Sequence, residues 1–379
     1  MKILVICHRA GSGISVIYER LFGELARYAE VDILADYTPD CDMSNIRNLY
    51  TEPYSPKMTS WSRKFIRWFG IMPIAEWWSR KVAPRVARDY DVVVSLMASS
   101  QLMPLVCGRY LARELGCKFA VYAVDAIPGP GGWTKPREYR RKIQVVRRYY
   151  SSCDYVASAN RHMLDFQLST FKHKPGLHTG VLLTPSPAES YELPISSENL
   201  LLYTGSLYGL RNPDHLLKAF KRLLVKYPDA QLLFIGMTIK LKRINKILTP
   251  EERERIVIMR PTNNLEPLFC RAKVLIDIDA DRNKDPFLSS KIVTYLKVNR
   301  MIVCETGRET PSREMFAGLN TIIQCDHSAD SLYDGISRAL EMASQPQDFS
   351  EREQLIREFS IEQVGEKFFN DLCKTCEVK

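Results

Sequence analysis

The chain has 379 residues and a formal net charge of +9, with 45% hydrophobic and 26% charged residues. This length suits two domains of roughly 180 residues better than one. No apolar run approaches the roughly 18 residues that cross a bilayer, so the sequence predicts no transmembrane helix. The positive charge implies an anionic partner, but it does not choose among nucleic acid, a nucleotide sugar and anionic lipid.

The ten cysteines lie mostly inside apolar segments. This distribution predicts reduced thiols that fill the core of a cytoplasmic protein. Cys373 and Cys376 form the one Cys-x-x-Cys pair, without a second pair or a nearby histidine. No cluster of histidine, cysteine and carboxylate has metal-ligand spacing, so we expect no metal site.

The chain begins with a predicted βαβ unit, a strand over 2–7, a helix to about residue 28 and a strand over 31–35. The apolar start is too short for the core of a signal peptide. The loop after the first strand contains Gly11 and Gly13, as in a dinucleotide-binding fingerprint. Val16 stands where that fingerprint has a third small residue, which argues against NAD(P) binding.

The segment 57–88 contains four of the five tryptophans and a single acid. One face of a predicted helix in this segment carries Trp61, Phe65, Trp68, Phe69 and Met72, with Arg63 and Lys64 interleaved. Such a helix suits the headgroup layer of an anionic membrane, where each basic residue adds roughly 1 kcal/mol. Two alternatives stay open. The aromatic residues pack on the protein's own sheet, or, less favoured because no recognised module surrounds them, they belong to a nucleic-acid surface.

Strands predicted over 91–96 and 118–124, with a helix over 101–115 between them, continue the alternation. The second of these strands opens into Asp125-Ala-Ile-Pro-Gly-Pro-Gly-Gly-Trp, a loop at the carboxyl end of a strand, where open α/β sheets bind ligands. Asp125 is the best-placed group in this half to orient or deprotonate a substrate hydroxyl. An equally good interpretation is that Asp125 caps its own turn.

A run rich in Pro, Ser and Glu over 184–198 indicates an interdomain linker. We therefore expect an N-terminal domain over 1–184, a linker over 185–198, a second domain over 199–350 and a last segment over 351–379. The second domain repeats the alternation, with strands expected over 200–203, 231–235, 256–259, 273–278 and 301–304 and helices over 214–227, 239–248, 264–271 and 331–343.

Two loops of the second domain each combine small residues with one cation. In the first, Gly205 and Ser206 form a turn after a strand, and Arg211 precedes a helix that begins near Pro213. Free backbone amides at the start of a helix, next to a cation, suit a phosphate-bearing ligand. One such loop is weak evidence, because a solvated arginine is common in loops.

The second loop lies further along the chain. Ser289 and Ser290 predict an N-cap before Lys291 and an apolar helix. Asp285 precedes this helix and Thr294 lies within it. Two loops that each deliver small residues and one cation are what a diphosphate needs.

The ordered set from Leu200 to Gly307 resembles the C-terminal half of the GT-B nucleotide-sugar glycosyltransferases of family 4, of the kind that assembles bacterial surface polysaccharides. In that family the first strand leads into a Gly-x-Leu turn with a basic residue, as Gly205-Ser-Leu and Arg211 do here. A later Pro-Ser-Lys-Leu-x-Glu-Tyr-Leu helix is similar to Ser290-Lys-Ile-Val-Thr-Tyr-Leu in this chain.

The resemblance implies an α/β GT-B fold, in which two doubly wound, Rossmann-like parallel-sheet domains face a cleft and a C-terminal helix crosses back to the N-terminal domain. It implies a retaining glycosyltransferase that moves a sugar from a nucleotide-diphosphate sugar, its donor substrate, to a saccharide or lipid-linked acceptor, without a metal or other cofactor. The enzyme is then expected in the cytoplasm, peripheral on the inner face of the plasma membrane, with no nucleic acid as partner.

The resemblance also implies roles for residues. The diphosphate contacts Gly205, Ser206, Arg211, Ser289, Ser290 and Lys291, and the glycine loop of Gly11 and Gly13 lies at the cleft. In the resembled family two acids eight positions apart contact the donor sugar and the ribose. Here Asp285 stands for the first acid, one position further away, and Thr294 occupies the place of the second.

This departure leaves ribose contact by Thr294 and retention to be tested. It also leaves two alternatives open. A nucleotide-sugar epimerase on the same two-domain plan converts its substrate without an acceptor. A non-catalytic membrane-surface or scaffold protein keeps the fold after losing the second acid.

Overall fold

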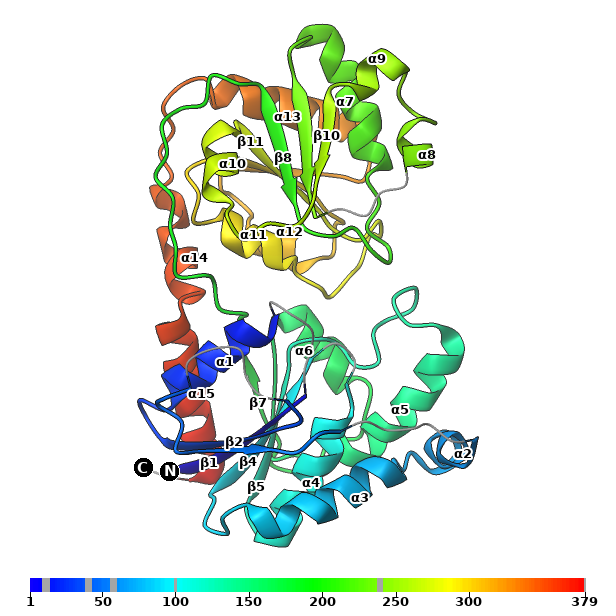
Figure 1. Ribbon diagram of the computed structural model, residues 1–379, viewed down its shortest axis with the longest axis vertical. Helices are drawn as coiled ribbons and strands as arrows, with labels where there is room; N and C mark the ends of the chain where they lie inside the picture. Colours follow the sequence, from blue (N-terminus) through cyan, green and yellow to red (C-terminus); the bar gives the residue numbers. More distant parts are fainter. Residues whose placement is uncertain (9–13, 38–42, 55–59, 99–100, 237–240, 378–379) are drawn as a thin grey trace. The chain divides into compact units, whose positions relative to one another are not determined.

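The computed structural model describes residues 1–379 except 9–13, 38–42, 55–59, 99–100, 237–240 and 378–379. The chain divides into two units, Met1–Ser186 with Glu358–Lys379, and Pro187–Arg357. Each unit contains one sheet whose neighbouring strands run parallel, with helices on its faces (Figure 1). Parallel neighbours need a crossover between them, which explains the alternation of strands and helices along the chain.

The sheet of the first unit has seven strands in the order β3-β2-β1-β4-β5-β6-β7. Its strands are β1 (Lys2–Cys7), β2 (Glu30–Ala35), β3 (Asn48–Thr51), β4 (Val92–Met97), β5 (Lys118–Ala123), β6 (Tyr155–Ser158) and β7 (His178–Val181). Its helices are α1 (Ile14–Leu25), α2 (Ser60–Phe69), α3 (Pro73–Val82), α4 (Met103–Leu115), α5 (Pro136–Tyr150), α6 (Arg161–Leu168) and α15 (Ile361–Cys376), with a 3-10 turn at Ala83–Arg85.

Both faces of this sheet are covered, because alternate residues of each strand enter two different cores. On one face, Leu4 packs with Trp78 of α3 and Val145 of α5. On the other face, Val5 packs with residues of α1 and with Phe368 of α15. The last helix of the chain therefore completes the core of the first unit, and it lies beside α1 in Figure 1.

The sheet of the second unit has six strands in the order β10-β9-β8-β11-β12-β13. Its strands are β8 (Leu200–Thr204), β9 (Gln231–Ile235), β10 (Ile256–Met259), β11 (Val274–Ile278), β12 (Met301–Glu305) and β13 (Ile322–Cys325). Its helices are α7 (Asp214–Lys226), α8 (Leu241–Ile244), α9 (Pro250–Arg253), α10 (Glu266–Arg271), α11 (Ser290–Tyr295), α12 (Pro311–Met315) and α13 (Ala329–Met342); a 3-10 turn (Ser350–Arg352) and α14 (Glu353–Glu358) follow.

The observed elements differ from the expected ones in two respects. Three strands of four residues each were not expected: β3 and β7, at the two edges of the first sheet, and β13, at an edge of the second. The expected linker is partly hydrogen-bonded within the second unit. The Tyr191 N–H donates to the Lys297 carbonyl at 2.8 Å, and the Lys297 ammonium donates to the Pro187 carbonyl at 2.6 Å.

Candidate active site

The strand order of the second sheet reverses between β8 and β11. From β8 the chain runs outward through β9 to β10 and then returns, so that β11 lies on the other side of β8. In open parallel sheets, the loops at the carboxyl ends of two such strands diverge and leave room for a ligand. The two loops begin here at Gly205 and Asp279. Most of the residues predicted to hold a diphosphate lie at this edge of the sheet.

Gly205 and Lys291 are in direct contact at this edge. Gly205 has a φ of +98°, in the left-handed region that favours glycine. A Cβ atom added there would lie 2.8 Å from Cε of Lys291. The lysine side chain therefore packs against the backbone of Gly205, where a larger residue would clash. The Lys291 ammonium lies 5.2 Å from the centre of the Tyr203 ring. The two loops that each combine small residues with one cation therefore meet at Gly205 and Lys291.

Tyr295 holds α11 against the end of β8. Its buried hydroxyl accepts a hydrogen bond from the Thr204 N–H at 2.8 Å and lies 2.9 Å from the Thr204 hydroxyl. Burial raises the pKa of Tyr295, so the phenol stays neutral. Because these bonds join the last residue of β8 to α11, the fold itself positions Lys291 next to Gly205.

The loop that carries Arg211 is tied to the segment after β11. Arg211 and Ala280 form an antiparallel bridge, and the Arg211 guanidinium lies 5.1 Å from the centre of the Tyr208 ring. Burial disfavours the charged form, but the neighbouring Tyr208 and Asp279 outweigh it and raise the pKa of Arg211. Arg211 therefore adds a permanent cation at the same edge as Lys291.

Two buried carboxylates balance these cations. Asp277, within β11, is fully buried and accepts a hydrogen bond from the Ser289 hydroxyl at 2.7 Å. Asp279, just after β11, accepts hydrogen bonds from the hydroxyls of Thr306 and Ser312, each at 2.8 Å. Burial lowers the pKa of Lys291, and the charges of both carboxylates oppose this shift without cancelling it.

Burial nevertheless dominates the titration of the site. It raises the pKa of Asp279 to about 7, and the charge of Asp277 adds to the shift. It lowers the pKa of Lys291 to about 8, although Asp277 opposes the shift, and Arg211 lowers it further. Both groups therefore titrate close to neutral pH. An anion bound beside them favours the protonated form of each, so binding and protonation are coupled.

Three buried polar atoms near this edge have no partner among the described residues: Oδ1 of Asp279, Oε2 of Glu305 and Nε2 of His327. The other oxygen of Glu305 lies 3.0 Å from Nδ1 of His327. Burial raises the pKa of Glu305. Burial opposes the charge of His327, but the bond to Glu305 outweighs it and raises the pKa of the imidazole. Buried polar atoms are almost always paired, so this group indicates space for a ligand or water.

The two serines at the start of α11 occupy their predicted positions, but the hydroxyl of the first has another partner. Ser289 holds the N-cap position, but its side chain makes no capping hydrogen bond. The predicted N-cap position is therefore correct, but the Ser289 hydroxyl donates to Asp277 rather than accepting from a helix N–H. Ser290, the first residue of the helix, is exposed. Because α11 has only six residues, its dipole contributes little, and Lys291 carries the positive charge of this loop.

The remaining predicted residues of the second unit have clear positions but untested roles. Thr294 is half-buried one turn after Lys291, on the same side of α11. The Asp285 carboxylate accepts a hydrogen bond from the Phe287 N–H at 3.0 Å and is buried. The exposed Ser206 donates to the Gly236 carbonyl at 3.3 Å. Ribose contact by Thr294 and sugar contact by Asp285 stay predictions.

Sequence reasoning missed Asp277 and Asp279, the carboxylates that act on Lys291. The available signal was the run Ile-Asp-Ile-Asp, which places two acids at the end of an otherwise apolar strand. A parallel strand with both faces covered leaves little room for unpaired charge. Such acids therefore point to cations nearby, although their identity needs the tertiary structure.

Asp125 follows β5 in the first unit and is half-buried. Burial raises the pKa of Tyr18, and the charge of Asp125 adds to the shift. The loop after Asp125 is held by the buried Gln167, whose amide donates to the Ile127 carbonyl and accepts from the Ile127 N–H, both at 2.9 Å. Gly11 and Gly13 lie outside the described residues. A catalytic role for Asp125 stays a prediction.

The tryptophan-rich segment separates into buried and exposed parts. Trp78 of α3 is 2% exposed and donates to the Glu52 carbonyl at 3.2 Å. Trp61 and Trp68 of α2 are 69% and 70% exposed, and Arg63 and Lys64 are exposed on the same helix. Packing on the protein's own sheet therefore accounts for Trp78 and is excluded for Trp61 and Trp68.

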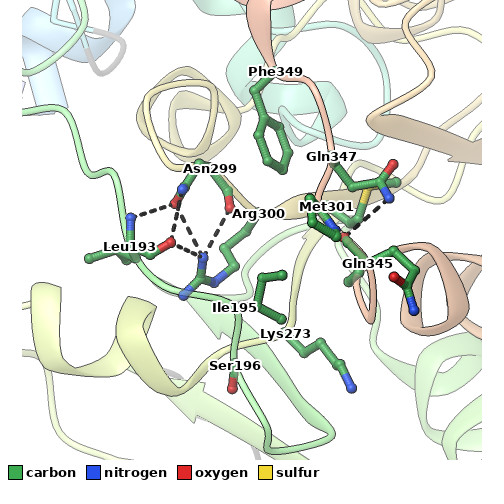
Figure 2. A pocket seen from close by; sticks show the side chains of 12 residues that line it. Leu193, Ile195, Ser196, Lys273, Asn299, Arg300, Met301, Gln345, Gln347 and Phe349 are labelled. Carbon is green, nitrogen blue, oxygen red and sulfur yellow. Dashed lines mark hydrogen bonds between the residues drawn. The ribbon is translucent and has the colours of Figure 1, made fainter.

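A cavity of about 190 Å³ lies at the opposite edge of the second sheet, where β11 and β12 begin (Figure 2). Arg300, the residue before β12, contributes to its wall. The Arg300 guanidinium donates to backbone carbonyls, among them those of Ala272 at 2.6 Å and Pro194 at 2.8 Å. Because its donors are already engaged by backbone, this cavity is a poorer anion site than the edge that holds Lys291.

Across the part of the chain that the structure describes, no three side chains of His, Cys, Asp or Glu are grouped so as to hold a metal ion. Among the same residues, no helix combines the length and the apolar character needed to span a membrane.

No protein-family model matches the chain, and no curated protein matches it. Solved structures do match over nearly the whole length. Anabaena HepE in complex with UDP-glucose is 11% identical, with 99% of this chain and 100% of that chain covered and a TM-score of 0.68. A glycosyltransferase from Rickettsia africae is 14% identical, with 100% and 99% covered and a TM-score of 0.68. The chain has the GT-B fold.

A third GT-B structure is a mutant of S. aureus TarM in complex with Fondaparinux, α-GlcNAc-glycerol and UDP. It is 10% identical, with 98% of this chain and 99% of that chain covered and a TM-score of 0.64. The predicted α/β GT-B fold of two parallel-sheet units is therefore confirmed. At such identities the likeness establishes the fold, and the activity has to be argued from the site.

Proposed function

We propose that this chain is a glycosyltransferase that moves a sugar from a nucleotide-diphosphate sugar to a saccharide or lipid-linked acceptor. The observation that carries the proposal is the contact between the Gly205 turn and Lys291, next to Arg211, at the switch point of the second sheet. The GT-B neighbours support it, because HepE was solved with UDP and glucose and with UDP-glucose.

The proposed chemistry is a displacement at the anomeric carbon. The bond from that carbon to the diphosphate oxygen breaks, the acceptor oxygen forms the new bond, and the acceptor proton is taken up by a base. Negative charge grows on the departing diphosphate, and Arg211 and Lys291 stabilise it from fixed positions. These two cations support transfer without a metal ion. The charges of Asp277 and Asp279 favour the protonated form of both cations before the donor arrives.

We assign the orientation of the acceptor hydroxyl to Asp125, supported by its position at a strand end and by the Gln167 clamp on the next loop. Asp285 is proposed for the donor sugar and Thr294 for the ribose. Transfer with retention follows from the family resemblance alone. The anomeric proton of the product, observed by NMR, tests it: a product of the opposite configuration to the donor removes retention from the proposal.

We also propose that the first unit contacts an anionic membrane surface on the cytoplasmic side. The exposed Trp61 and Trp68, with Arg63 and Lys64 on the same helix, support this contact. Co-sedimentation with vesicles tests it. The full chain should sediment with vesicles of anionic lipid at low salt and remain in solution with neutral ones; failure to sediment with the anionic vesicles ends this part of the proposal.

A binding experiment tests the central proposal. A thermal-shift panel of UDP, GDP, dTDP and CDP first identifies the nucleotide, because specific binding stabilises the folded chain. Calorimetric titration with that nucleotide then compares wild type with Arg211→Ala and Lys291→Ala. Lys284→Ala is the matched control, since Lys284 lies in the same segment and its side chain is 75% exposed.

Each of the two site variants should lose about a hundredfold in transfer rate, and most of its nucleotide affinity. The control should stay within about twofold of wild type, because exposed charges contribute little. A chain that binds none of the four nucleotides, or site variants that bind as well as wild type, would reject the transferase. Turnover of the nucleotide sugar with and without acceptor separates the transferase from an epimerase.

A further inference from the structure

Five arginines line one hollow of the first unit. Arg63 and Arg67 come from α2, and Arg137, Arg140 and Arg141 come from α5. The hollow has a volume of about 620 Å³. In each helix the spacing of three or four residues places the arginines on one side of the helix. None of these residues belongs to the proposed nucleotide site, which lies in the second unit.

Close packing of α2 on α5 brings the two sets of arginines together. Ile66 of α2 and Val145 of α5 belong to the same buried core. Gly70, which follows α2, lies so close to α5 that an added Cβ would be 2.4 Å from the Gln144 carbonyl oxygen. Figure 1 shows the two helices side by side. The packing of α2 on α5 therefore fixes the backbone positions from which the arginine side chains extend.

The hollow has a large excess of positive charge. Arg67, Arg137, Arg140 and Arg141 form no ion pair with the described residues. The nearby acid Glu138 forms an ion pair with Lys142, with 2.6 Å between Oε1 of the carboxylate and Nζ of the lysine. Like charges held together repel one another, and this cost falls when an anion with clustered charge binds. Guanidinium groups bind phosphate through two parallel N–H donors, so several arginines in one hollow suit adjacent phosphates.

An exposed aromatic row runs along the same helix. Trp61 stacks on Phe65, with ring centres 5.5 Å apart, and Phe65 lies 5.8 Å from Phe69. Trp61 and Phe69 are 69% and 62% exposed. The short helix α2 thus presents cations toward the hollow and aromatic rings toward solvent. A ligand that matches both has clustered phosphates joined to an apolar chain.

We propose that this hollow binds the diphosphate head of a lipid diphosphate, with the lipid chain beside the aromatic row. The hollow selects the head group by its clustered charge, whereas a surface of singly charged lipids offers only diffuse charge. That this lipid carries the sugar acceptor rests on the proposed function; the binding itself does not.

Vesicle binding of the full chain tests the proposal. One set of neutral vesicles contains a few per cent of a polyprenyl diphosphate, and a second set contains enough phosphatidylglycerol to give the same total charge. Wild type should bind the diphosphate vesicles at least about tenfold more tightly, and free inorganic diphosphate should compete. Equal binding to the two kinds of vesicle overturns the proposal and leaves only a general anionic surface.

Two variants locate the site. Arg137→Gln with Arg140→Gln removes two exposed lining residues and should weaken binding to diphosphate vesicles by about thirtyfold, roughly tenfold or less per charge. Arg147→Gln with Arg148→Gln makes the same charge change at the end of α5, outside the hollow. Equal losses in the two double variants contradict a site in the hollow.

A third variant separates the head group from the chain. Trp61→Ala with Phe69→Ala should weaken vesicle binding and leave calorimetric binding of inorganic diphosphate unchanged, because these rings are largely exposed. If this variant loses both vesicle binding and diphosphate binding, the aromatic row does not act on the lipid chain alone. Titration with the nucleotide diphosphate is run on every variant. If wild type binds the nucleotide but not the lipid diphosphate, this inference is rejected and the proposed transferase is not. If wild type binds the lipid diphosphate but no nucleotide, the proposed transferase is rejected and this inference is not.

Discussion

The protein holds two groups of cations in opposite ways. At the switch point of the second sheet, Arg211 and Lys291 lie beside the buried carboxylates Asp277 and Asp279, which offset their charge. In the hollow of the first unit, the arginines are mostly exposed, and the described lining residues include no carboxylate.

The difference indicates two kinds of ligand. Arg211 and Lys291 are partly buried, and cations withdrawn from water need nearby carboxylates to stay charged, so this site suits one small anion. Exposed cations cost little to keep, since water screens them, and they suit a larger anion at a surface. Four experiments probe this contrast, beginning with the largest expected effect.

Replacement of Asp277 by Ala should destabilise the protein most. The change leaves the buried Ser289 hydroxyl without its acceptor and removes a charge that offsets Lys291, at a cost of about 3 kcal/mol. The free energy of unfolding from urea titration measures the loss. Arg140→Gln, in the hollow, should stay within about 0.5 kcal/mol of wild type. Equal effects of the two changes contradict the contrast.

Salt should affect the two sites unequally. Between about 0.1 M and about 1 M salt the Debye length falls from about 10 Å to about 3 Å, which screens exposed charges far more than buried ones. Vesicle binding should weaken by at least about tenfold, and nucleotide binding by about threefold or less. Titrations at matched salt concentrations measure the affinity for vesicles and the affinity for the nucleotide. If the two affinities fall by the same factor, the cations of the nucleotide site are as exposed to solvent as those of the hollow.

The nucleotide site should also respond to pH. The pKa of Lys291 lies near 8 instead of 10.5, so its ammonium is lost as the pH rises from 7 to 9. Asp279, with a pKa near 7, becomes negative over part of the same range. Nucleotide affinity should therefore fall by about tenfold between pH 7 and 9. Lys291→Arg should reduce the fall, because arginine stays charged, and a fall of the same size in both proteins removes Lys291 as its cause.

The same pKa also predicts a pH dependence of the free energy of unfolding. Between about pH 10.5 and pH 8 the unfolded chain binds a proton at Lys291 that the folded chain does not. Stability from this group is thus present at high pH and is lost as the pH falls through that window. Because the guanidinium group does not deprotonate in proteins, vesicle binding through the hollow should not weaken from pH 7 to 9.

The smallest effect is expected at Gly205. Gly205→Ala places a Cβ at a positive φ and against the Lys291 side chain, at a cost of about 1 kcal/mol in stability. Nucleotide affinity should fall by several-fold, since the lysine has to move. Gly116→Ala is the control, because it has a φ of +69° with no atom within 4 Å of the added Cβ. An unchanged affinity in Gly205→Ala contradicts the contact.

The sequence alone determined the fold class and, at the candidate site, the glycine turn and the two cations. The alternation of apolar strands with amphipathic helices is a local property, and it predicts parallel sheets because parallel neighbours need crossovers. Gly205, Arg211 and Lys291 were predictable for the same reason, since each lies next to a strand end or helix start that short-range patterns reveal.

Only the tertiary structure decided which groups face these residues. Ser289 has the sequence of an N-cap, but packing turns its hydroxyl to Asp277. The hollow exists because α2 and α5, distant in the chain, pack together. Which charges meet, and how deeply they are buried, depends on packing between distant segments, and no local pattern carries that information.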